Sequence, residues 1–146
     1  MAHTLLLLHV GVTCFMCGLI WLVQIVHYPL FAHVGRAEFS AYQRQHMRRT
    51  SWVVAAPMCI EGATAVALLF WSPVGVPLAG LWVGFAFLVG LWASTYFWQV
   101  PRHELLLRGF DRGAHQSLVR GNWLRTLLWS ARALLVLFFV HAAQPL

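Results

Sequence analysis

Four long apolar stretches, separated by short polar segments, dominate this chain. They lie at about residues 4–27, 51–71, 77–98 and 118–142. A helix needs about 20 mainly apolar residues to cross the hydrocarbon core of a bilayer, and each stretch is long enough. Only 10% of the residues are charged, well below the ~25% of a typical soluble domain. The sequence therefore predicts an all-α integral membrane protein, a single domain over residues 1–146 with four transmembrane helices.

The basic residues indicate the orientation of these helices. All ten are arginines, and nine of them lie in residues 36–49 or 102–125. Under the positive-inside rule, both Arg-rich connections face the cytoplasm and both termini face the other side, as in a bacterial inner membrane. Basic residues at a membrane surface are attracted to anionic lipid head groups, so a nucleic-acid partner is not expected. The expected partner is the lipid bilayer, with a homo-oligomer or a larger membrane complex left open.

A polar motif occurs twice, 76 residues apart. Six of 24 aligned positions are identical: His27/His103, Leu30/Leu106, Arg36/Arg112, Arg44/Arg120, Arg49/Arg125 and Thr50/Thr126. We predict an internal duplication, with repeat 1 at about 4–71 and repeat 2 at about 80–142. Two tandem two-helix repeats would form a four-helix bundle with a pseudo-two-fold axis along the membrane normal. Pro29 and Pro101, where the first and third spans reach the cytoplasmic face, are expected to bend or end their helices.

One polar residue from each predicted helix lies near the cytoplasmic face. These residues, called the His/Asn layer below, are His27, His46, His103 and Asn122. Helix bundles build metal and cofactor sites from facing side chains, and neutral imidazole binds copper and iron. We therefore predict that the layer binds copper or iron, with haem as one form. The alternative is that the histidines are interfacial and bond to backbone or lipid. His33 or His115 could replace a chosen ligand, and Tyr42 could supply an oxygen donor.

A second polar layer is predicted one helical turn deeper. It consists of Gln24, Gln99, Arg49 and Arg125, each three or four residues from a member of the His/Asn layer. The glutamines could accept hydrogen bonds from the histidines and so hold the cofactor. The arginines are candidate catalytic residues, because a guanidinium stabilises an anionic intermediate.

Glu61 and Arg132 lie deeper still, at similar depth in the second and fourth spans. Ionisable residues inside a membrane usually pair and face the bundle interior. We predict that these two face each other. A structural ion pair is one interpretation. In the other, Glu61 is catalytic as a proton relay or a metal ligand, Arg132 contributes to cofactor binding, and Pro57 loosens the backbone nearby.

The second copy of the motif resembles part of a known family. The segments Val100-Pro101-Arg102-His103-x2-Leu106 and Asn122-Trp123-x-Arg125-Thr126 precede a terminal apolar span. This order is similar to the later half of the small four-span membrane family that includes the anthrone oxygenases. His103 stands where the oxygenase members carry Asn. The resemblance implies oxidation of a hydrophobic, often aromatic, compound that enters from the bilayer.

Two classes of function follow from these observations. In the first, the protein is a metal-dependent, oxygenase-like oxidoreductase that acts on a hydrophobic small molecule at the His/Asn layer. In the second, it is a non-catalytic subunit of a larger membrane bioenergetic complex and binds haem, pigment or lipid through the same histidines. A transporter is less favoured, because no span shows the Gly/Pro-interrupted break that is typical of a midplane substrate site.

Overall fold

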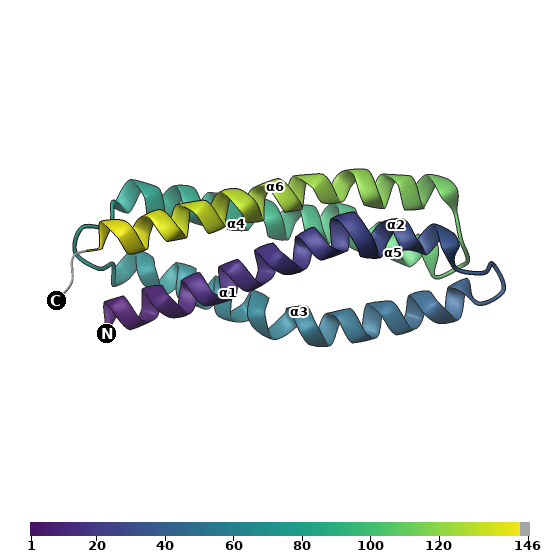
Figure 1. The fold of residues 1–146 in the computed structure, drawn as a ribbon, viewed down its shortest axis with the longest axis horizontal. Helices are drawn as coiled ribbons and strands as arrows, with labels where there is room; N and C mark the ends of the chain where they lie inside the picture. Colours follow the sequence, from purple (N-terminus) through teal and green to yellow (C-terminus); the bar gives the residue numbers. More distant parts are fainter. Residues whose placement is uncertain (144–146) are drawn as a thin grey trace.

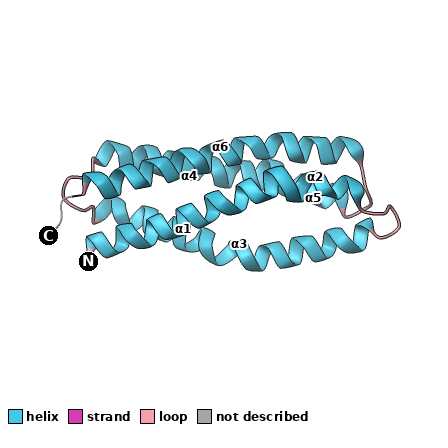
Figure 2. Ribbon diagram, viewed as in Figure 1, coloured by secondary structure: helices cyan, strands magenta, loops and turns pink. Residues whose placement is uncertain are grey.

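Four helical spans make up the computed structural model, which describes residues 1–143 (Figure 2). The first span contains α1 (Ala2–Leu22), the π-helical turn η1 (Val23–His27), α2 (Tyr28–Leu30) and the 3-10 turn η2 (Phe31–His33). The second is α3 (Phe39–Phe70). The third contains α4 (Leu78–Ser94), the π-helical turn η3 (Thr95–Gln99) and α5 (Val100–Leu106), and the fourth is α6 (Arg112–Ala142). All four are long and apolar enough to cross a membrane, which confirms the predicted all-α, four-helix class.

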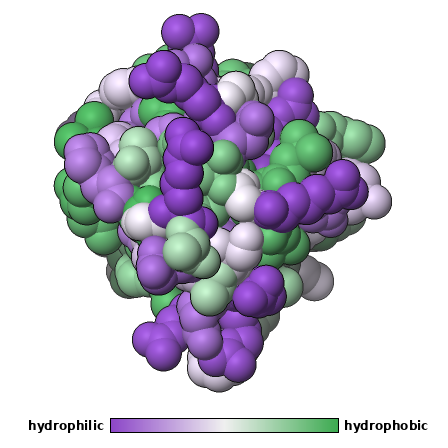
Figure 3. Space-filling view, turned by 90° about the vertical axis from the view of Figure 1, so that its right-hand side faces the viewer, coloured by the Kyte–Doolittle hydropathy of each residue, from purple (hydrophilic) through white to green (hydrophobic). Residues whose placement is uncertain are grey.

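The spans form an antiparallel bundle in which each packs mainly against two neighbours (Figure 1). α1 packs against α3 and α6, and α4 packs against the same two helices. The beginning of α1 and the end of α6 lie at one end, together with a turn that contains Gly75 at a φ of 91°. The connections 34–38 and 107–111 lie at the other end, called the Arg-rich end below. Figure 3 looks onto this end and shows hydrophilic residues gathered over it.

Polar and apolar residues are distributed as a bilayer requires. Large apolar side chains such as Trp52, Phe70 and Leu134 are exposed on the flanks of the bundle. Glutamate, arginine, asparagine and glutamine side chains are buried inside it. A protein in water would be destabilised by this arrangement, whereas lipid tails solvate the apolar flanks and interior hydrogen bonds satisfy the polar groups. The distribution identifies an integral membrane protein.

Pro29 and Pro101 neither end their helices nor leave them regular. Each lies two residues after a π-helical turn, and the helix continues beyond it. Proline has no N–H, and its ring crowds the carbonyl four residues earlier, so the preceding turn widens. The two π turns are 72 residues apart (23 and 95), whereas the polar motifs are 76 apart. In the backbone, Gln99 rather than His103 therefore occupies the position that corresponds to His27.

Candidate functional site

His27 and His46 are in direct contact at the Arg-rich end. His27 Nε2 lies 2.8 Å from His46 Nδ1, and Thr50 Oγ1 lies 3.2 Å from the same Nδ1. The π turn η1 ends at His27, and α3 carries His46 and Thr50 one turn apart on the same face. His46 Nε2 makes no hydrogen bond with the described part of the chain. The structure thus brings two of the predicted metal ligands together, and one ring nitrogen remains available.

His103 binds to a different pair of side chains. Its Nε2 lies 2.9 Å from the Tyr28 hydroxyl, and its Nδ1 lies 2.9 Å from Gln43 Nε2. The Gln43 amide also donates to the His103 carbonyl, so it fixes both the ring and the backbone of α5. The His103 ring stacks on that of His46, with 5.2 Å between centroids. Both of its nitrogens are therefore occupied by protein groups.

Sequence reasoning missed Tyr28 and Gln43. Tyr28 directly follows His27, and Gln43 precedes His46 by one helical turn. Both are buried, and a buried amide or phenol almost always has a hydrogen-bond partner. The available signal was the polarity of Gln43 one turn from a candidate ligand, on the same face of its helix.

Asn122 belongs to a third group, with Gln24 and Arg125. Asn122 Nδ2 donates to Gln24 Oε1 at 2.9 Å, and Arg125 donates to Asn122 Oδ1 at 3.0 Å. The Gln24 amide donates in turn to the Val119 carbonyl at 3.3 Å. Gln24 therefore joins the first span to α6 and does not act on His27. The predicted His/Asn layer is divided among three hydrogen-bonded groups, the second and third of which are in contact through Tyr28 and Arg125.

A cavity of about 150 Å³ lies among these groups and is called the Gln99 cavity here. Its polar lining is Tyr28, His46, Thr50, Ser51, Thr95, Gln99, His103 and Arg125, and its apolar lining is Met16, Leu19, Ile20, Val23, Met47, Val54 and Val100. All four spans contribute to it. Ser51 of α3 and Val100 of α5 are exposed, so the cavity lies next to the outer surface of the bundle between these helices.

The Gln99 side chain is the unusual feature of this cavity. It is 1% exposed, and neither Nε2 nor Oε1 has a hydrogen-bond partner in the described part of the chain. Arg125 Nε, which is also buried, has none either. A buried polar group without a partner costs about 1–3 kcal/mol. Gln99 and Arg125 line the cavity, but their unpartnered atoms are enclosed behind its surface, so a ligand would reach this donor, this acceptor and the guanidinium N–H only after a side-chain rotation.

His46 lies between this cavity and a second hollow on the surface. The second hollow, called the surface groove here, is lined by His27, Glu38, Ala41, Tyr42, Arg44, Gln45, His46, Arg49 and Thr50. These residues belong to the end of η1, to the connection 34–38 and to the first part of α3, which lie at the Arg-rich end. Arg49 is exposed there, whereas Arg125 is buried in the bundle. The two arginines that the sequence placed in one layer therefore belong to different sites.

The remaining candidates lie outside the Gln99 cavity. His33 is exposed, Tyr42 is half-buried and lines the surface groove, and His115 Nε2 lies 2.8 Å from the Tyr28 carbonyl oxygen. Glu61 and Arg132 form the predicted buried pair, with Arg132 Nε 3.1 Å from Glu61 Oε1. This confirms that they face each other.

The Glu61 carboxylate is held by more than its ion pair. Thr13 Oγ1 donates to Oε1 at 2.9 Å and Trp129 Nε1 donates to Oε2 at 3.2 Å. Arg132 also donates to the Gly84 carbonyl and lies 3.4 Å from His9 Nε2. These contacts join the spans in the half of the bundle toward the termini. Neither Glu61 nor Arg132 lines the Gln99 cavity.

The geometry at the Arg-rich end bears on the predicted metal site. Within residues 1–143 no group of three or more His, Cys, Asp or Glu side chains is placed to hold a metal ion. His27 and His46 together present two imidazoles, and His103 and Asn122 bond elsewhere. Two imidazoles in direct contact at 2.8 Å also leave no space for a haem plane between them.

Comparisons of the chain with protein-family models, with curated proteins and with solved structures find no match.

Proposed function

We propose that this protein takes a hydrophobic small molecule from the bilayer, binds its polar group in the Gln99 cavity and acts on it as an oxygenase-like oxidoreductase. The observation that carries the proposal is the buried Gln99 amide, whose two polar atoms have no partner in the described part of the chain. A ligand hydroxyl, which is both donor and acceptor, would satisfy them. We propose that such a ligand enters from the hydrocarbon region between α3 and α5, where Ser51 and Val100 are exposed.

His46 is the proposed base for this ligand. Its ring lines both the Gln99 cavity and the surface groove, and its Nδ1 contacts His27 Nε2. A proton taken from a ligand hydroxyl by His46 Nε2 would be matched by transfer of the Nδ1 proton to His27. His27, which is half-buried in the surface groove, would then release its own proton to water. General bases act in this way when an imidazole lies within hydrogen-bond reach.

Arg125 is the proposed stabiliser of the anion that this step creates. It lines the same cavity, and its Nε has no protein partner in the described range. A fixed guanidinium in a site of low dielectric stabilises an oxyanion more strongly than water does. Loss of the hydroxyl proton makes an aromatic compound richer in electrons, which prepares it for oxidation.

A metal-dependent form of the reaction is the second candidate. The observation in its favour is the 2.8 Å contact between two imidazole nitrogens, which a small change of side-chain angle would turn into two ligands for copper or iron. Metal analysis of purified protein tests it. Bound metal should be lost in His27→Ala and His46→Ala and kept in His3→Ala, which changes an N-terminal histidine far from the pair.

The main proposal is tested with the protein in lipid nanodiscs and 4-propylphenol as the probe. Wild type should bind it saturably, and Gln99→Leu should bind at least tenfold more weakly. Gln116→Leu, a matched change at an exposed glutamine outside the cavity, should bind like wild type. Under oxygen, mass spectrometry should detect an oxidised product with wild type and none with His46→Gln.

Two results would change the proposal. Absence of saturable binding by any hydroxylated probe would overturn it. Saturable binding without an oxidised product would contradict the oxidoreductase part and favour a non-catalytic binding subunit.

A further inference from the structure

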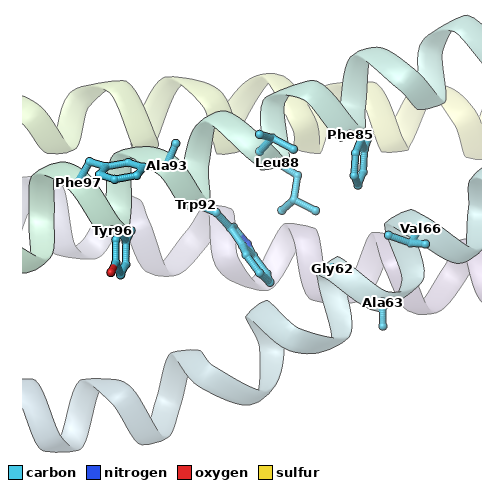
Figure 4. A pocket seen from close by; sticks show the side chains of 10 residues that line it. Gly62, Ala63, Val66, Phe85, Leu88, Trp92, Ala93, Tyr96 and Phe97 are labelled. Carbon is cyan, nitrogen blue, oxygen red and sulfur yellow. The ribbon is translucent and has the colours of Figure 1, made fainter.

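A long apolar groove lies between α3 and α4, on the outside of the bundle. It has a volume of about 740 Å³ and is lined by Gly62, Ala63, Val66, Phe85, Leu88, Val89, Trp92, Ala93, Tyr96 and Phe97. Figure 4 shows Phe85, Leu88 and Trp92 projecting from α4 toward the part of α3 that carries Gly62 and Ala63. A Cβ on Gly62 would lie 3.1 Å from Trp92 Cζ2, so a small residue is needed where the helices approach.

This groove and the Gln99 cavity occupy consecutive lengths of the same gap. The groove uses residues 62–66 of α3 and 85–97 of the third span, and the cavity uses residues 47–54 and 95–103 of the same two spans. Because the spans are antiparallel, the two hollows follow each other along the bundle, and in the π turn η3 Thr95 of the cavity directly precedes Tyr96 and Phe97 of the groove. From Phe85 to His103 the third span advances 18 residues, or about 27 Å at 1.5 Å per residue.

The cavity limits the head group to a small one. A cavity of about 150 Å³ is the size that accepts a benzene ring. Gln99 Oε1 needs a donor, and Gln99 Nε2 and Arg125 Nε need an acceptor. The oxygen of a hydroxyl on a single ring accepts from Gln99 Nε2 and Arg125 Nε, and its one proton is donated to Gln99 Oε1 in the bound state or to the base His46 in the reaction.

We infer that the ligand is a single hydroxylated aromatic ring with a long hydrocarbon tail, its ring in the Gln99 cavity and its tail in the groove between α3 and α4. The inference rests on the proposed function, because it assumes that the cavity binds a polar head group. The groove would bind the tail of that same molecule. The ligand would then lie along the membrane normal, as the surrounding lipids do.

The position of the bound tail, rather than the affinity of the ligand, tests whether the tail lies in the groove. Bulk lipid is as apolar as the groove, so transfer of a tail from lipid into the groove gains little free energy. The tail would instead fix the orientation of the ring. The experiment must therefore locate both ends of the bound molecule.

Two photoreactive 4-dodecylphenols in nanodiscs provide this location, one with a diazirine beside the ring and one with a diazirine at the end of the tail. The ring probe should label peptides that line the Gln99 cavity, and the tail probe should label peptides around Phe85 and Val66. An excess of 4-dodecylphenol should compete with both. Ala63→Trp, which fills the groove, should reduce tail labelling at least fivefold. Ala86→Trp, the same change at an exposed alanine of α4 outside the groove, should leave labelling unchanged.

Different outcomes would contradict this inference and the proposed function on which it rests. Ring labelling in the cavity with tail labelling spread over other lipid-facing helices would overturn the inference and leave the proposed function intact. Failure of the ring probe to label the cavity in a competable manner would overturn both. Equal loss of tail labelling in Ala63→Trp and Ala86→Trp would also count against the groove, because it would show a general effect of added bulk.

Discussion

At the scale of single residues, two glutamines with equivalent positions in the sequence differ in whether their side chains have hydrogen-bond partners. Gln24 and Gln99 each lie one turn from a histidine, and both are buried. Gln24 joins Asn122 to the Val119 carbonyl, whereas Gln99 has no partner in the described part of the chain. The first is a structural residue and the second lines a cavity.

This difference predicts opposite effects of the same substitution. Gln24→Leu should lower the free energy of unfolding by about 1–3 kcal/mol, because it leaves the buried Asn122 Nδ2 unpaired. Gln99→Leu should leave stability unchanged or raise it, because it removes buried polar atoms that have no partner. Unfolding by denaturant in detergent micelles measures both. Equal destabilisation by the two variants would contradict this interpretation of Gln99.

The Glu61–Arg132 pair makes a second residue-scale prediction. Both side chains are at most 1% exposed, and removal of one partner leaves a buried charge uncompensated. Glu61→Gln and Arg132→Gln should each lower the free energy of unfolding by about 3–5 kcal/mol. Thermal unfolding in detergent tests this, with Glu104→Gln, a change at an exposed glutamate, as the control. Unchanged stability in both buried variants would show that the pair contributes nothing to the fold.

At the scale of helices, the π turns determine which side chains meet. A helix has 3.6 residues per turn, so one extra residue rotates all later side chains by about 100°. The turns before Pro29 and Pro101 place His27 against His46 and turn Gln99 into the cavity. Spacing along a regular helix therefore did not predict the direction of these side chains.

Close approach of η3 and α6 gives a prediction at this scale. A Cβ on Gly121 would clash with the Trp98 indole, whose Nε1 donates to the Ser117 carbonyl at 3.3 Å. Gly121→Ala should therefore lower the free energy of unfolding by about 1–3 kcal/mol. Gly18→Ala, where nothing lies within 4 Å, should raise it by about 0.5–1 kcal/mol, as alanine does in an open helix position. Destabilisation of equal size in both variants would contradict a specific contact with Trp98.

At the scale of the whole molecule, the ends of the bundle differ in charge. The connections at one end hold arginines, and the turn at the other end holds none. The positive-inside rule predicts that the Arg-rich end faces the cytoplasm. In a variant whose three cysteines are replaced by serine, Gly75→Cys and Arg112→Cys should react with impermeant maleimide from opposite sides of the membrane. Labelling of both from one side would contradict the four-span topology.

The sequence by itself determined the class of the fold and the end of the bundle where the polar residues gather. Both depend on local properties: the length of an apolar stretch against the thickness of a bilayer, and the place of arginines along the chain. It also predicted that Glu61 faces Arg132, because two charges at one depth in an apolar interior must pair.

Only the tertiary structure decided which polar side chains share a site. The four residues of the His/Asn layer are divided among three hydrogen-bonded groups, and Tyr28 and Gln43 enter one of them. The 76-residue motif aligned His27 with His103, while the π turns align His27 with Gln99. The direction of each side chain depends on each widened turn and on the helices packed beside it. Gln99, which was predicted to accept a hydrogen bond from a histidine, therefore lies at the centre of the candidate site instead.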